Sequence, residues 1–125
     1  PHPNAAKLFM DWFLSSVPIH PIWLCPLRPR DRWSLYPMRP GHTYVNVGFW
    51  SVVPITPGAP EGATNRMIEQ KVSELGGHKS LYSDAFYSPE HFAALYGGIS
   101  YARLKKRYDP DSRLLNLYDK AVRRQ

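Results

Sequence analysis

The sequence contains a single cysteine, Cys25, among 125 residues. One thiol forms no intramolecular disulfide and builds no cysteine-rich zinc site, so a reducing compartment such as the cytoplasm is the expected location. Because Trp23 and Leu24 precede it, we expect Cys25 to be a small buried side chain; a nucleophilic role would need a base or a positive helix end beside it.

The motifs that bind nucleotides and metals are also missing. The sequence has no G-x-G-x-x-G, no G-x-x-x-x-G-K-[ST], no H-E-x-x-H and no C-x-x-C motif. Its 5 histidines do not have the spacing of metal ligands. We therefore expect no metal site, and no segment that holds a nucleotide pyrophosphate by itself.

No apolar run is long and uninterrupted. The longest, residues 9–27, contains Asp11, His20 and several prolines, which would break a helix or leave a charge in lipid. We expect no transmembrane helix. The chain starts with proline and carries no secretory signal, and we interpret it as part of a longer polypeptide.

Acidic residues are outnumbered, with 10 Asp and Glu against 16 Lys and Arg, for a net charge of +6. This excess permits weak attraction to phosphates or to an acidic membrane surface, so a peripheral membrane location is compatible with the sequence. The local excess in residues 103–125 falls on a predicted helix, where it indicates a solvated face. We expect no nucleic-acid partner.

Hydrophobic residues make up 43% of the chain, enough for a folded domain. Of the 13 prolines, 11 lie in residues 1–60, which predicts strands and loops there and helices mainly afterwards. The fold class is expected to be α+β, with an antiparallel sheet and helices on one face. The pattern predicts helices at 5–16, 63–75, 89–96, 99–108 and from about 114 or 117, and strands at 19–27, 42–53 and 79–86.

One face of the predicted strand 42–53 is polar. Tyr44, Asn46 and Gly48 would place a phenol, a carboxamide and a gap side by side, as a sheet does when it binds a ligand. In the predicted strand 79–86, Tyr82 and Asp84 are two residues apart, so their side chains would converge on one reacting centre. The alternative is a surface that faces solvent or another domain.

Three segments resemble a known family. Residues 20–27, His-Pro-Ile-Trp-Leu-Cys-Pro-Leu, are similar to a Tyr-Pro-Ile-Trp-Leu-Cys-Pro-Phe segment of the delta-24 sterol reductases, which belong to the FAD-linked oxidase superfamily of vanillyl-alcohol oxidase. Residues 44–48 resemble its Tyr-Ile-Asp-Ile-Gly strand, and residues 81–92 resemble its Leu-Tyr-Ala-Asp-Cys-Tyr block and the helix that follows. More distantly, residues 76–77 and 108–116 resemble the carboxyl-terminal pattern of sugar-lactone oxidases.

The resemblance implies the carboxyl-terminal part of an FAD-dependent oxidoreductase. Residues 1–97 would form a substrate-binding cap with a ferredoxin-like sheet, and residues 98–125 a helical tail that returns to an FAD-binding domain outside this chain. That domain would hold most of the FAD. The chain alone is then expected to be inactive, and its uncovered flavin-facing surface favours self-association.

The resemblance also assigns roles to residues. The catalytic candidates are Tyr82 and Asp84, substrate-binding ones are Trp23, Tyr44 and Asn46, and cofactor-binding ones are Tyr82 and Asn116. The chain departs from the family at Asn46, which replaces an acidic residue, and at His20, which replaces a tyrosine. Because of these departures a sterol is not the only substrate to expect, and the resemblance implies a small molecule that is a sterol or another lipid-like alcohol.

The predicted reaction is reduction of a sterol side-chain alkene or oxidation of an alcohol, with the flavin transferring the electrons. A second hypothesis is a non-catalytic binding or interaction module with a cap-like fold, because fold does not determine function. A third, binding of phosphate or nucleic acid through the basic carboxyl-terminal stretch, requires a steep salt dependence.

Overall fold

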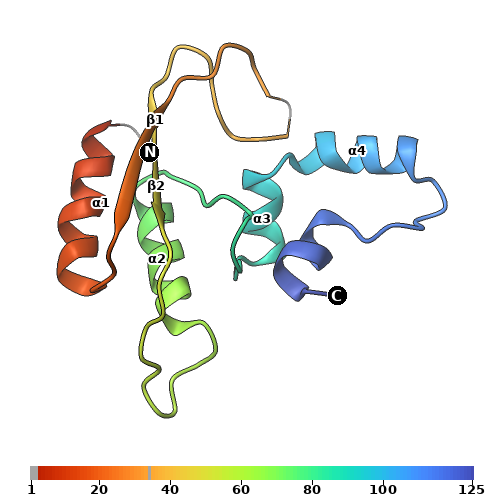
Figure 1. Ribbon diagram of the computed structural model, residues 1–125. Helices are drawn as coiled ribbons and strands as arrows, with labels where there is room; N and C mark the ends of the chain where they lie inside the picture. Colours follow the sequence, from red (N-terminus) through yellow and green to blue (C-terminus); the bar gives the residue numbers. More distant parts are fainter. Residues whose placement is uncertain (1–2, 34) are drawn as a thin grey trace.

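The computed structural model describes residues 3–33 and 35–125. Figure 1 shows α1, α2 and the sheet at one end of the molecule and α3, α4 and the carboxyl-terminal segment at the other. None of the helices in the described residues has the length and apolar character needed to cross a membrane. In chain order the elements are α1 (Pro3–Ser16), β1 (Ile22–Leu27), β2 (Tyr44–Phe49), α2 (Ala63–Glu74), α3 (Pro89–Leu95), α4 (Gly98–Tyr108) and a π-helical turn, η1 (Asp119–Arg123).

The two strands form an antiparallel sheet, in which Ile22 lies opposite Phe49 and Leu27 opposite Tyr44. Val47 and Phe49 belong to one face of β2, and both pack against the apolar cluster that α1 and α2 supply. The helices at this end therefore cover one face of the sheet. The predicted α+β class, with an antiparallel sheet and helices packed on it, is confirmed.

The first core lies between α1, α2 and the sheet. Its centre is Phe13, which is 0% exposed and whose ring centroid is 4.6 Å from that of Phe49. Burial of one such phenylalanine contributes roughly 1.5–3 kcal/mol. The helix ends at Ser16, just before Pro18, because proline lacks the N–H that the next helical hydrogen bond needs. The buried members are Phe9, Phe13, Val17, Ile19 and Ile68.

The predicted strand 79–86 is wrong, because this segment is irregular and turns at residues 81–83. Its backbone groups are bound by side chains instead of a neighbouring strand. The Tyr96 hydroxyl donates to the Lys79 carbonyl at 2.6 Å, and the Phe86 N–H donates to the Glu69 carboxylate at 3.0 Å. Since these partners satisfy the buried backbone, no third strand is required.

The second core is rich in tyrosine and lies around α3. The Ser88 hydroxyl accepts a hydrogen bond from the His91 N–H at 3.2 Å and so caps the start of α3, as the sequence predicts. The Tyr118 hydroxyl donates to the Tyr87 carbonyl at 3.1 Å, which fastens the carboxyl-terminal segment to this core. The buried members are Ala85, Tyr87, Phe92 and Tyr96.

Candidate functional site

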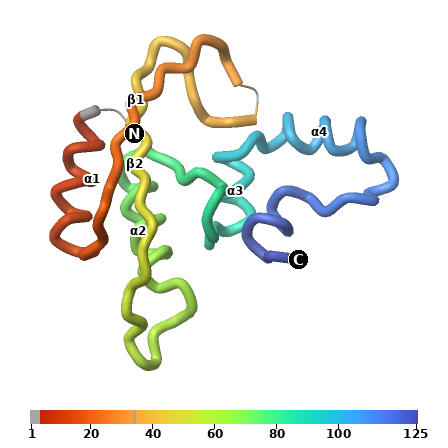
Figure 2. Tube along the Cα trace, viewed as in Figure 1, coloured from red at the N-terminus to blue at the C-terminus, as the bar shows by residue number. Residues whose placement is uncertain are grey.

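A hollow of about 620 Å³ runs along β2, and we call it the β2 groove. Figure 2 shows the chain after α2 passing the sheet on its way to α3, and residues 78–83 of this stretch contribute one wall. The other walls come from β1, β2 and the loop between them, with contributions from α1 and α2. Four of the six predicted site residues line it, namely Trp23, Tyr44, Asn46 and Tyr82.

Trp23 forms an apolar wall of the β2 groove because the residue opposite it is a glycine. Gly48 pairs with Trp23 across the sheet, and a Cβ atom at Gly48 would lie 1.9 Å from Cε2 of the indole. The indole therefore lies directly over the Gly48 backbone, in space that any other residue would fill. The gap that the sequence predicts at Gly48 is real, and Trp23 occupies it.

Tyr44 and Asn46 follow one another on the polar face of β2. The Tyr44 hydroxyl accepts a hydrogen bond from the Arg39 N–H at 3.0 Å, which orients the phenol. Asn46 is exposed and lines the β2 groove.

The neighbouring edge strand β1 exposes Cys25, so the expectation of a buried thiol is wrong. The side chain is exposed because the sheet has only two strands and its helices cover one face.

The lining of the groove also includes two polar residues that the sequence analysis does not identify, Tyr36 and His78. The rings of Tyr36 and His78 meet edge to face, with centroids 5.0 Å apart. Burial raises the pKa of the Tyr36 phenol and lowers the pKa of the His78 imidazole, so both groups favour their neutral forms. Two neutral groups that both donate and accept hydrogen bonds suit a hydroxyl or carbonyl of an uncharged ligand.

A buried ion pair forms at Lys79, the residue that follows His78 in the lining of the groove. The Lys79 ammonium lies 3.4 Å from the Glu69 carboxylate, and the two side chains are 11% and 8% exposed. Burial lowers the pKa of Lys79, while the Glu69 charge opposes that shift. Lys79 also donates to the Asp84 carbonyl. The feature of the sequence that could have indicated this ion pair is Glu69, because its carboxylate follows the buried Ile68 on α2.

The two predicted catalytic residues are separated. Tyr82 lines the β2 groove and its side chain is 90% exposed, whereas Asp84 lies outside the lining. The Asp84 carboxylate is 3.6 Å from Nη2 of Arg124 in the carboxyl-terminal segment. Their expected convergence relied on a strand, and the turn at residues 81–83 removes that alternation. Their catalytic roles stay a prediction.

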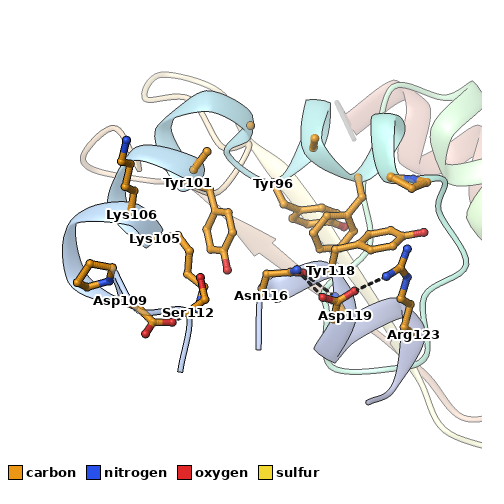
Figure 3. A pocket seen from close by; sticks show the side chains of 16 residues that line it. Tyr96, Tyr101, Lys105, Lys106, Asp109, Ser112, Asn116, Tyr118, Asp119 and Arg123 are labelled. Atoms are coloured by element: carbon orange, nitrogen blue, oxygen red, sulfur yellow. Dashed lines mark hydrogen bonds and ion pairs between the residues drawn. The ribbon is translucent and has the colours of Figure 1, made fainter. Parts of the chain in front are cut away.

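A second hollow, of about 520 Å³, lies between α3, α4 and the carboxyl-terminal segment (Figure 3). Four of its charged groups form ion pairs: Lys105 pairs with Asp109, and Arg123 lies 3.0 Å from Asp119. Asn116 lines this hollow and accepts a hydrogen bond from the Asp119 N–H at 2.8 Å, which caps η1. The structure therefore does not bring Asn116 next to Tyr82, and its cofactor role stays a prediction.

No cluster of three or more His, Cys, Asp or Glu side chains suited to a metal ion occurs in residues 3–33 and 35–125. The groove offers aromatic and aliphatic walls together with hydrogen-bonding side chains. Such a surface fits an uncharged, largely apolar ligand better than a phosphate, because its one Lys is already paired with Glu69.

Comparison with known proteins finds sequence similarity to one kind of enzyme in several organisms. No family model and no solved structure matches the chain. It is 26% identical over 110 residues to the Delta(24)-sterol reductase of Rattus norvegicus and 24% identical over 110 residues to that of Homo sapiens. The chain is related in sequence to Delta(24)-sterol reductases. It is also 26% identical over 116 residues to the Delta(24)-sterol reductase homolog dhcr-24 of Caenorhabditis elegans.

These alignments cover 86% of the chain for the mammalian reductases and 91% for the nematode homolog. The chain spans only about a fifth of the length of these relatives, 21% and 22%. These similarities support the relationship to the sterol reductases that residues 20–27, 44–48 and 81–92 indicate. The assignment of the chain to the carboxyl-terminal cap stays a prediction.

Proposed function

We propose that this chain is the carboxyl-terminal, substrate- and flavin-covering part of an FAD-dependent oxidoreductase, with the β2 groove as its substrate side. One observation carries the proposal. Trp23, Tyr44, Asn46 and Tyr82 come from the three motifs of the resemblance, and all of them line a single hollow. A fold that used these residues only for stability would not need to gather them on one open surface.

The substrate class follows from the lining of the groove. Trp23, Met38 and Val45 offer apolar surface, and Tyr36 and His78, whose rings are in contact, offer neutral hydrogen-bonding groups. This arrangement suits a rigid apolar body with one hydroxyl, such as a sterol or another lipid-like alcohol. The relatives are named as sterol reductases, which favours reduction of a sterol alkene over oxidation of an alcohol.

The groove fits a flavin ring but not the rest of FAD. Its aromatic walls and hydrogen-bonding groups can cover an isoalloxazine ring. A pyrophosphate needs free cations, and the one Lys of this lining is already paired with Glu69. FAD, when bound, supplies the hydride chemistry. The exposed Tyr82 phenol is the candidate to hydrogen-bond or protonate the substrate, and Asp84 is the candidate to orient it through Arg124.

The proposal also includes how the chain is divided, where the protein works and which domain is its partner. Residues 1–97 form the cap, residues 98–125 form the tail, and the protein works in a reducing compartment such as the cytoplasm. The partner that holds most of the FAD is a domain outside this chain. Asn116 touches the cofactor only if that domain reaches the hollow beside α4.

Catalysis is tested in the longer polypeptide that contains this chain and its flavin domain. Tyr82→Phe should lower the rate of flavin turnover on the order of 100-fold, the usual size of a lost general-acid contribution. Asp84→Asn should lower it less. The control is Tyr108→Phe, because Tyr108 is 74% exposed on α4 and away from the β2 groove. Unchanged turnover in both Tyr82→Phe and Asp84→Asn would remove them from the catalytic site.

Substrate binding is tested in the chain alone through Gly48→Ala, which removes no lining side chain but moves one of them. The added methyl must displace the Trp23 indole, and we expect sterol affinity, measured with a radiolabelled sterol, to fall on the order of tenfold. Ser51→Ala, at an exposed position just after β2, is the control. Equal affinity in both variants would place the sterol elsewhere.

The second candidate is a non-catalytic binding module. It is favoured by the size of the β2 groove, about 620 Å³, which is large enough to hold a small ligand between this chain's own side chains. If the chain binds sterol at this groove but leaves the spectrum and turnover of its flavin domain unchanged, this function replaces the first.

A further inference from the structure

An uncharged, apolar loop connects β2 to α2, and we call residues 50–60 the proline loop. It extends away from the rest of the molecule, as Figures 1 and 2 show. The stretch from residue 40 to residue 60 contains no Asp, Glu, Lys or Arg. Trp50 is 81% exposed, Val52 94% and Ile55 83%. Large apolar side chains gathered at such exposure mark an interaction surface.

The proline loop is held in shape by local contacts. The Ala59 N–H donates to the Thr56 carbonyl at 3.0 Å, and Gly58 between them has a φ of 81°, as in a tight turn with Pro57 before the glycine. Val53 packs against the first core and anchors the base of the loop. Val52 therefore adjoins the anchored base at Val53, and Ile55 lies between that base and an ordered turn at residues 56–59.

The backbone of the proline loop suits a water-poor environment. Pro54, Pro57 and Pro60 have no N–H group, so this stretch carries fewer donors that would lose their hydrogen bonds to water. A charged side chain in the same place would oppose transfer out of water, and none is present. These properties favour a lipid surface over the mixed polar and charged rim typical of a protein interface.

Cationic side chains gather where the proline loop meets the body. The Arg66 side chain donates to the Glu61 backbone carbonyl at 3.0 Å, and Arg124 lies 2.8 Å from the Glu61 carboxylate. Both guanidinium groups stack on the ring of Phe86, at 4.1 and 5.3 Å from its centroid. Asp84 is the other acidic group at Arg124, and the whole chain carries +6. The apolar side chains of the loop, then Trp50, then the two arginines match the hydrocarbon, the interface and the phosphate groups of a bilayer, in that order.

The proline loop is continuous with the β2 groove, because Trp50 belongs to both. We propose that residues 50–60 dock this chain on a phospholipid bilayer by inserting Val52 and Ile55 into its interface. Docking brings the rim of the groove at Trp50 to the membrane surface. An apolar substrate then passes from lipid to groove without crossing water, a consequence that rests on the proposed function, whereas the docking itself does not.

The test is flotation of the full chain with phosphatidylcholine vesicles, and with vesicles that also contain phosphatidylserine. We expect binding to both, somewhat stronger with the anionic lipid. The double variant Val52→Asp, Ile55→Asp should reduce the partition coefficient by at least about tenfold on both vesicles. Ile99→Asp is the matched control, because Ile99 is 75% exposed on α4 and should leave binding unchanged.

A milder pair, Val52→Ser and Ile55→Ser, guards against an effect of the new charges, and circular dichroism checks that all variants fold. Three results would overturn the proposal. These are no binding to either vesicle, binding that needs phosphatidylserine and survives the double variants, and a dimer in sedimentation analysis that the double variants abolish. The assay contains neither flavin nor sterol, so its failure is separate from a failure of the sterol-binding test on Gly48→Ala.

Discussion

The two cores of this chain are built on different principles. The first core joins α1, α2 and the sheet through phenylalanine and aliphatic side chains, whose attraction has no direction. The second core joins α3 to distant segments through tyrosine hydroxyls that bind particular backbone groups, as Tyr96 does with the Lys79 carbonyl and Tyr118 with the Tyr87 carbonyl. The β2 groove draws on both regions, with apolar walls from the first and polar groups held by the second.

This difference predicts how each region fails. Loss of side-chain volume should destabilise the first core, and loss of a single tyrosine hydroxyl should destabilise the second. The boundary between them, where Glu69 of α2 meets Lys79, should respond to charge and to pH.

The largest effect is expected for Phe13→Ala in the first core. Phe13 is 0% exposed and contacts Phe49, so truncation leaves a cavity and should lower the free energy of unfolding by about 3–5 kcal/mol. Urea denaturation measures it. Leu8→Ala on the same helix is the control, because Leu8 is 57% exposed and should cost less than about 1 kcal/mol. Equal losses in the two variants would contradict the assigned core.

Glu69→Gln at the boundary should have the next largest effect, about 3 kcal/mol, because it leaves the Lys79 ammonium buried without its counter-charge. The matched control is Glu74→Gln, whose partner Lys71 is nearer the surface, with a loss below about 1 kcal/mol. A loss no greater than that of the control would show that the pair contributes little.

The same variant has a pH signature. Burial lowers the pKa of Lys79 below its ordinary 10.5, and Glu69 opposes this. Between the lowered pKa and 10.5 the unfolded chain holds more protons, so the free energy of unfolding rises with pH in that window. Without the Glu69 charge the pKa falls further, and the rise should begin at a lower pH in urea titrations. Parallel pH profiles for the variant and the native chain would contradict this assignment.

Tyr96→Phe in the second core should have the smallest effect, about 1–2 kcal/mol, because it removes one hydroxyl and leaves the Lys79 carbonyl without that donor. Tyr108→Phe, at a position that is 74% exposed, should change the free energy of unfolding by less than about 0.5 kcal/mol. Indistinguishable melting curves for the two variants would mean that the second core, like the first, depends on apolar area alone.

The first core was the more predictable from sequence. Periodicity and the prolines indicate α1, α2 and both strands, since apolar side chains that share one core repeat with the period of their element. Residues 79–86 also alternate, yet they form no strand. Their hydrogen-bond partners Glu69, Tyr87 and Tyr96 lie outside the local pattern, and only the tertiary structure brings them together.

The site divides in the same way. The motif residues Trp23, Tyr44, Asn46 and Tyr82 were predicted and do line one groove. The separation of Asp84 from Tyr82 depends on a turn that alternation does not reveal, and the isolation of Asn116 depends on the cap of η1. Tyr36 and His78 are in the groove because of the path of their loops, for which the sequence pattern offers no signal.

The contact between Trp23 and Gly48 also gives the protein a built-in optical probe. The indole lies over bare backbone inside the groove and is still 52% exposed, so a bound molecule would strip water from one of its faces. Removal of that water shifts indole emission to shorter wavelength. Occupancy of the groove can therefore be followed without any attached dye, by comparing native emission with that of a chain in which Trp23 is phenylalanine.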